Sequence, residues 1–64
     1  MTLGRKIKER RLEKGQTQTE YGEEFGAGKS LVFQWEKGIN KPNNKRLKLI
    51  ADDMNITVTE LLKS

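Results

Sequence analysis

Apolar residues recur at helical spacing in five stretches of the chain, and glycine, proline or asparagine stands between these stretches. The most regular stretch is the fourth, where Leu47, Ile50, Ala51 and Met54 follow the i, i+3, i+4, i+7 pattern of one helix face. The pattern predicts an all-α chain of five short helices, in which the fourth is a core element.

The first helix is expected from about Thr2 to Lys14, with Gly15 as a left-handed C-terminal stop. Its apolar arc is bracketed by Leu3, Ile7 and Leu12. Arg11 falls in the middle of this arc. Because a charge beside a core costs free energy unless it is paired, Arg11 is expected to have an acidic partner.

The second helix begins at Thr17, because Thr17 and Glu20 have the spacing of a capping box. Its apolar stripe consists of Tyr21 and Phe25. Gly22 allows another helix to approach closely, and Gly26 is expected to end the helix. The turn from 26 to 28 is short, so the second and third helices should cross steeply as a helix-turn-helix.

The third helix is expected from about 29 to 37, with Gly38 as its stop, and it separates into two faces. The inner face consists of Leu31, Val32 and Trp35, with Glu36 at its edge. The outer face consists of Lys29, Ser30, Phe33, Gln34 and Lys37. The outer face therefore combines cations and hydrogen-bonding groups with one aromatic ring.

The fifth helix follows Asn55, which can adopt a left-handed stop, and a second capping box formed by Thr57 and Glu60. Its apolar residues are Val58, Leu61 and Leu62. Leu61 and Leu62 are expected to complete the core or to form a dimer contact.

The composition restricts the classes of function. With 64 residues, the chain is expected to form one domain spanning 1–64. The absence of cysteine and histidine excludes disulfides, zinc clusters and histidine acid–base chemistry, and no cofactor is indicated. Neither Tyr21 nor Ser30 has an accompanying base, so an enzyme is not expected. The longest apolar runs are two or three residues, which excludes a membrane span. With no signal core, the protein is expected in the cytoplasm, associated with the nucleoid and encoded by a bacterium or a phage.

The charge favours an acidic partner. Lysine and arginine total 13 against 9 acidic residues, which gives a net charge of +4. Nucleic acid, a membrane surface and an acidic protein all suit this charge, and charge alone does not choose among them.

The segment from Thr17 to Gly38 combines Thr-Gln, a small residue at Gly22, a glycine turn and a helix ending Val32-x-x-Trp35-Glu36-x-Gly38. This order resembles the phage-repressor and Cro-like (Xre) helix-turn-helix family. The likeness extends to the Pro-x-x-x-x-Leu-x-x-Ile-Ala run that begins at Pro42. It implies a compact five-helix bundle of the lambda-repressor-like type that binds duplex DNA as a transcriptional regulator, most often a repressor.

In this family the third helix lies in the major groove and the second crosses the DNA backbone. The resemblance implies base-edge contacts by Gln18, Lys29, Ser30, Phe33 and Gln34, and DNA backbone contacts by Lys37, Asn40 and Lys41. The chemistry is compatible, because lysine can donate to guanine, glutamine can pair with adenine, and an apolar ring can touch a thymine methyl. A solvated helix face is the alternative for the polar residues.

The family also pairs an arginine of the first helix with the glutamate after the tryptophan position, which implies an Arg11–Glu36 ion pair. Three residues depart from the usual pattern. Gln16 replaces a leucine, Gly28 replaces a serine or threonine cap, and Phe33 replaces a polar residue. Phe33 leaves two interpretations open, a base or sugar contact and a contact with a neighbouring residue or protein.

The expected partner is double-stranded DNA, bound by a weak homodimer with recognition helices about 34 to 36 Å apart. No small-molecule ligand and no membrane is indicated. The alternative is a protein-interaction module of the antitoxin-like or polymerase-contacting kind, anchored by Leu31 and Phe33. A steep salt dependence of DNA affinity would argue against that alternative.

Overall fold

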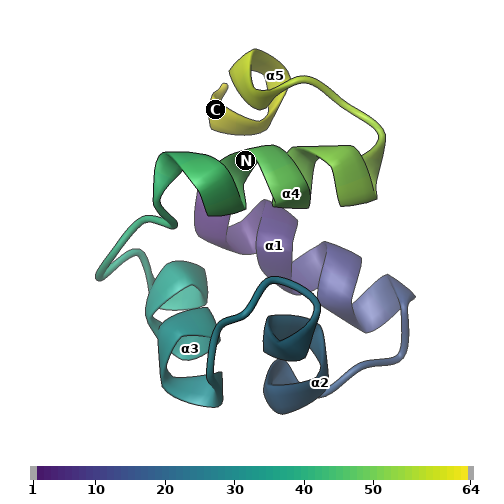
Figure 1. The fold of residues 1–64 in the computed structure, drawn as a ribbon, viewed down its shortest axis with the longest axis vertical. Coiled ribbons are helices and arrows are strands. Elements are labelled where there is room, and N and C mark those ends of the chain that lie inside the picture. The colour runs from purple at the N-terminus through teal and green to yellow at the C-terminus, as the bar shows by residue number, and fades with distance from the viewer. Residues whose placement is uncertain (1, 64) are drawn as a thin grey trace.

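The computed structural model describes residues 2–63. They form five helices and no strand (Figure 1). The helices are α1 (Leu3–Glu13), α2 (Gln18–Glu23), α3 (Lys29–Lys37), α4 (Asn44–Met54) and α5 (Val58–Leu62). The all-α, five-helix architecture predicted from the sequence is confirmed.

The helix ends follow the capping signals of the sequence. Thr17 Oγ1 accepts from Glu20 N at 3.1 Å and Thr17 N donates to Glu20 Oε1 at 2.8 Å, so the capping box of α2 is complete. Thr57 and Glu60 repeat it at α5. α2 is shorter than predicted, because the chain tightens after Glu23 into i→i+3 hydrogen bonds before Gly26 adopts a φ of 69°.

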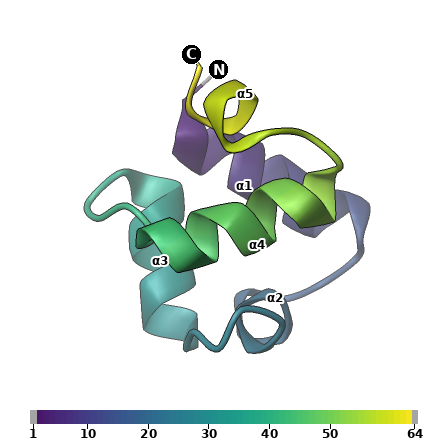
Figure 2. The ribbon, with the colours of Figure 1, turned by 45° about the horizontal axis from the view of Figure 1, so that its top comes forward.

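α1 crosses the middle of the molecule and packs against α3 and α5, while α2 packs against α3 and α4 against α5. Figures 1 and 2 show α5 at one end of the molecule and α2, with the start of α3, at the opposite end. All five helices and the α2–α3 turn contribute to one core, which consists of Ile7, Tyr21, Phe25, Ala27, Val32, Trp35, Leu47, Ile50, Ala51 and Leu61. The helix-turn-helix is therefore built onto the core and away from the chain ends.

Two glycines permit close backbone packing. A Cβ on Gly22 would lie 2.4 Å from the carbonyl oxygen of Ala27. The sequence predicted a close approach at Gly22, and the backbone that approaches is the turn before α3. A Cβ on Gly4 would lie 2.5 Å from the carbonyl oxygen of Glu36 and 2.6 Å from that of Trp35. The second approach, between α1 and the end of α3, was not predicted.

Two predicted apolar positions prove to be exposed. Leu12 is 58% exposed, because it lies about 140° around α1 from the buried Ile7 and points away from the core. Leu61 completes the core at 0% exposure, whereas Leu62 is 45% exposed. Of these two leucines of α5, Leu62 is therefore the one that is free to contact another molecule.

Ion pairs connect α1 to α2 and α4. Asp53 accepts from Arg10 Nε at 3.0 Å and from Lys14 Nζ at 2.8 Å, and Lys14 also bonds Glu24 at 2.7 Å. Burial disfavours the charge on Asp53, but the hydrogen bonds from Lys14 and Arg10 outweigh it and hold the pKa of this carboxyl below its usual value. These cations are therefore neutralised within the fold.

Lys6 has a structural role that the sequence did not reveal. Its Nζ donates to the carbonyl oxygens of Glu60 at 2.9 Å, of Leu61 at 3.1 Å and of Lys63. A cation at the C-terminus of a helix satisfies unpaired carbonyls and interacts favourably with the helix dipole. Lys6 thus fastens α5 to the start of α1.

Candidate nucleic-acid interface

The turn between α2 and α3 is fixed by hydrogen bonds from α4 and by a buried residue that follows it. Arg46 of α4 donates to the carbonyl oxygens of Phe25 at 3.2 Å and of Gly26 at 2.9 Å. Ala27 is buried in the core directly after it. Gly28 is the N-cap of α3, with an extended backbone (φ −83°) and no side-chain hydrogen bond to the helix. Gly28 and the first two residues of α3, Lys29 and Ser30, are exposed.

The outer face of α3 separates from its inner face as the sequence predicted. Val32 and Trp35 are buried, whereas Lys29, Ser30, Phe33 and Lys37 are exposed and Gln34 is half-buried. A shallow hollow on this side of the molecule is lined by Gln18, Lys29, Ser30, Phe33, Gln34 and Ile39. All five side chains expected to contact base edges are therefore brought together on one surface, which we call the recognition face.

Ile39 belongs to the recognition face, and sequence reasoning missed it. It is 64% exposed and follows the left-handed C-cap Gly38. Its backbone N–H donates to the carbonyl oxygen of Gln34 at 3.0 Å, which holds it beside the end of α3. The one signal for Ile39 in the sequence was that it is an isolated apolar residue in a polar loop.

The Gln34 side chain is oriented by the same loop. Its Oε1 accepts a hydrogen bond from Asn40 Nδ2 at 2.6 Å. This bond fixes the direction in which the Gln34 amide presents its donors, because rotation of the amide would place its nitrogen against the Asn40 donor. Asn40 therefore acts on a neighbouring side chain of the recognition face.

Gln18 is tied to the ion pair beneath α3. Arg11 Nε donates to Glu36 Oε2 at 2.7 Å and Arg11 Nη2 donates to Glu36 Oε1 at 3.2 Å. The two side chains are 13% and 6% exposed, so the pair is largely buried. Gln18 Nε2 donates to Glu36 Oε1 at 3.2 Å. The ion pair inferred from the resemblance is present, and the link from it to Gln18 was not foreseen.

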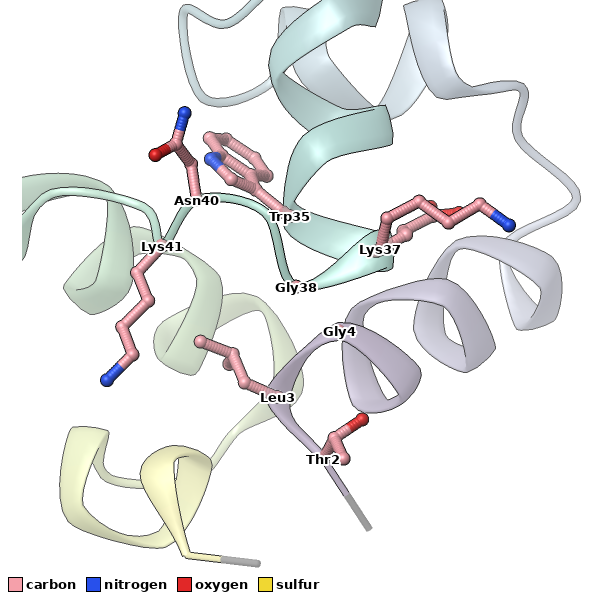
Figure 3. Close-up of a pocket in the computed structure, with 9 residues that line it drawn as sticks. Thr2, Leu3, Gly4, Trp35, Lys37, Gly38, Asn40 and Lys41 are labelled. Atoms are coloured by element: carbon pink, nitrogen blue, oxygen red, sulfur yellow. The ribbon is translucent and has the colours of Figure 1, made fainter.

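The three residues expected to contact the DNA backbone do not converge on one point. Figure 3 shows Lys37 and Lys41 extending in different directions, with the Asn40 amide pointing away from Lys41. All three border a pocket between the start of α1 and the α3–α4 loop. They surround the end of α3 and are suited to separate anionic groups.

The lysines near the recognition face differ from the three cations around the C-terminal end of α1. Within residues 2–63, no carboxylate forms a salt bridge with Lys29, Lys37 or Lys41. Arg10, Arg11 and Lys14 are all paired internally. The positive charge that remains for an acidic partner therefore includes the lysines around α3.

Residues 2–63 offer little support for a catalytic phenol, a metal site or a membrane-spanning helix. Tyr21, considered above as a catalytic phenol, is fully buried, and burial raises its pKa. Across residues 2–63, no group of three or more acidic side chains is arranged to hold a metal ion. No helix of that range has the length and apolar character needed to cross a membrane.

Comparison with known proteins agrees with this geometry. Residues 7–61 match the model of a family described as helix-turn-helix. The fold is similar to the P22 c2 repressor, in a crystal structure of that protein with a synthetic operator. The TM-score is 0.88 with 25% sequence identity, and the match covers 98% of this chain and 96% of that one.

The chain is also 31% identical over 62 residues to the HTH-type transcriptional activator BcrR of Enterococcus faecalis. The match covers 97% of this chain and 30% of that relative, so the chain spans less than a third of its length. The family match includes α3 and most of the other four helices. The chain therefore belongs to the phage-repressor and Cro-like (Xre) helix-turn-helix family.

Proposed function

We propose that this protein binds duplex DNA in a sequence-specific manner and regulates transcription, as a repressor in the simplest case. The observation that carries the proposal is the recognition face, where polar side chains of α2 and α3 line one exposed hollow. Lysines with no carboxylate partner among residues 2–63 lie beside it. The similar P22 c2 repressor was crystallised with an operator, which supports the same kind of partner here.

The proposed contacts follow from side-chain chemistry. Gln34 is suited to bidentate hydrogen bonds with adenine, and Lys29 to guanine O6 and N7. Gln18, Ser30 and Phe33 complete the surface that faces the bases. A second set, which would position the domain through phosphates without reading sequence, consists of Lys37, Asn40 and Lys41.

The operator would be a short inverted repeat bound by two copies of the chain. Two-fold symmetry would place the α3 helices about 34 to 36 Å apart, one turn of DNA. Leu62, exposed beside the buried Leu61, is available for a weak contact between copies. We place this activity in the cytoplasm, where bacterial and phage operators are found, and assign it to residues 1–64 as one domain without enzymatic activity.

The test is a selection of random duplex DNA by the purified protein at two salt concentrations, repeated with Gln34→Ala. Gln34→Ala should relax the preference at one position of each half-site, with a loss of discrimination of about 1 to 3 kcal/mol. Lys48→Ala is the matched control, because Lys48 is exposed on α4 and lies outside the recognition face. It should leave the selected sequence unchanged.

The outcomes separate the candidate functions. An enriched palindrome whose preference relaxes only in Gln34→Ala would establish operator binding through α3. Salt-sensitive binding with no enriched sequence would reduce the function to nonspecific DNA association. A folded protein that binds no DNA at either salt concentration would refute the proposal and favour the protein-interaction module.

A further inference from the structure

The loop after α3 is bonded to Gln34 both at its backbone and at its side chain. The backbone N–H groups of Ile39 and Asn40 donate to the carbonyl oxygen of Gln34 at 3.0 and 3.5 Å. The Asn40 side chain donates from Nδ2 to Gln34 Oε1 at 2.6 Å. Because Gly38 makes the left-handed turn that returns the chain to α3, the backbone itself sets Asn40 beside Gln34.

The two side chains of this pair border different surfaces. Gln34 lines the hollow of the recognition face, whereas Asn40 lines the pocket between the start of α1 and the α3–α4 loop. Gln34 is half-buried and Asn40 is exposed. A base edge docked in the hollow would therefore meet the Gln34 amide, and Asn40 would act on that base through Gln34.

The side-chain hydrogen bond gives the Gln34 amide a direction. Its oxygen faces the Asn40 donor, and its Nε2, which carries two hydrogens, forms no hydrogen bond within residues 2–63. Rotation of the Gln34 amide by half a turn would place Nε2 against Asn40 Nδ2, donor against donor, unless the Asn40 amide turned as well. The free end of Gln34 is therefore a donor.

The base edges in the major groove divide on the same property. Guanine and thymine present the carbonyl acceptors O6 and O4, whereas adenine and cytosine present the amino donors N6 and N4. A glutamine that offers both atoms of its amide suits adenine, which is the contact considered above for Gln34. A glutamine whose oxygen is engaged and whose nitrogen is free favours guanine or thymine instead.

We propose that Asn40 is a positioning residue that holds the Gln34 amide with Nε2 toward the DNA, so that guanine or thymine is selected where Gln34 contacts a base. The inference rests on the proposed DNA binding and specifies the base class that Gln34 reads. Asn40 keeps one Nδ2 hydrogen for a phosphate, so the two roles are compatible. Guanine or thymine should be favoured over adenine or cytosine by about tenfold, within the range of a well-directed base contact.

The experiment changes the group that faces Gln34. Asn40→Asp places a carboxylate, which only accepts, where Nδ2 was, so the Gln34 amide must turn its nitrogen inward and its oxygen outward. The position to examine is the one at which Gln34→Ala relaxes the selected sequence. Fluorescence anisotropy at low salt, on four duplexes that differ only in that base pair, measures the preference. It should change from guanine or thymine to adenine or cytosine, with the other selected positions unchanged.

Asn43→Asp is the matched control for the added negative charge. Asn43 is exposed in the same loop, and a carboxylate can replace its N-cap hydrogen bond from Arg46 N. Asn43→Asp should therefore lower affinity for all four duplexes alike and keep the wild-type base preference. Circular dichroism of each variant verifies that the fold is intact.

Two further variants separate positioning from direct contact. Asn40→Ala removes the donor, so the Gln34 amide is free to turn, and the preference should fall below about threefold. Asn40→Asp combined with Gln34→Ala should show no preference for either base class at this position, because the residue through which Asn40 acts is gone.

Three outcomes would overturn the inference while leaving DNA recognition intact. A wild-type preference for adenine or cytosine, unchanged by Asn40→Asp, would mean that the two amides pair in the reverse direction. A change of base by Asn40→Asp that persists in the Gln34→Ala background would mean that Asn40 contacts the base itself. A folded Asn40→Ala variant with the full wild-type preference would show that Gln34 needs no positioning. Failure of the wild type to select any sequence would refute the proposed function, and the inference with it.

Discussion

The inner and outer faces of α3 differ in what their side chains contact, although they alternate along one nine-residue helix. Val32 is 0% exposed and Trp35 2% exposed, whereas Phe33, between them in sequence, is 44% exposed. The inner residues join the core with side chains of the other helices. Four of the outer residues, Lys29, Ser30, Phe33 and Gln34, line a shallow hollow together with Gln18 and Ile39. Stability and recognition should therefore be separable by substitution within α3.

The charges near α3 divide in the same way. On the inner side, Glu36 is bonded by Arg11 and Gln18 in a largely buried cluster. On the outer side, Lys37 lies over the ring of Phe33 and is exposed. The first arrangement orients helices relative to one another, and the second is available to a partner. The predictions below test this division.

Glu36→Ala should have the largest effect. It leaves Arg11, which is 13% exposed, without its carboxylate partner and should cost about 3 to 5 kcal/mol of unfolding free energy. Urea denaturation followed by Trp35 fluorescence measures the loss. Lys37→Ala, the next residue on the outer face, is the matched control. A loss of unfolding free energy under about 1 kcal/mol would show that the Arg11–Glu36 pair does not hold the inner face of α3 against α1.

Gly4→Ala should destabilise the α1–α3 contact by about 1 to 3 kcal/mol, because its Cβ overlaps backbone oxygens that cannot rotate away. Alanine is the better helix former by about 1 kcal/mol, so a gain in stability would contradict the packing argument. Thermal denaturation provides the measurement. Gly28→Ser is the control, since nothing lies within 4 Å of a Cβ there and serine caps helices well.

Asp53→Asn should cost about 1 kcal/mol at neutral pH and less in acid. The pKa of folded Asp53 lies below its ordinary value of 3.8, so its contribution is complete above about pH 4. It is lost as the pH falls through the lower pKa of the folded state. Unfolding free energies from pH 7 to 2 should converge for the two proteins. A constant difference would mean that the charge is not involved. DNA discrimination should be unchanged, because the hydrogen-bond partners of Asp53 are Arg10 and Lys14, which lie outside α3.

Lys37→Ala should have the smallest effect on the fold, within about 0.5 kcal/mol. It should weaken binding to all duplexes similarly and reduce the slope of log K against log salt by about 0.9, as expected for one phosphate contact. Titrations at four salt concentrations measure the slope. An unchanged slope, or a loss of affinity confined to one sequence, would contradict a contact between Lys37 and the DNA backbone. The proposed division between base-contacting and backbone-contacting residues would then not hold for Lys37.

Much of the recognition face could be predicted from the sequence. The five base-contact candidates include four on the outer face of α3, and a helical period of 3.6 residues is enough to place those four on one arc. Ile39 and the Asn40–Gln34 hydrogen bond could not be predicted, because both depend on the path of the chain after Gly38. Gln18 was predicted on this surface from the family resemblance, because it lies in α2 and the periodicity of α3 says nothing about it.

The sequence by itself determined the features that are encoded within one or two turns of chain. These are the capping boxes at Thr17 and Thr57, the left-handed stops at Gly38 and Asn55, and the two faces of α3. Only the tertiary structure decided which backbone approaches Gly4, and that Lys6 caps a helix 54 residues away. Those contacts depend on the angles at which helices cross. Such angles result from the packing of the whole core, and no local pattern of residues specifies them.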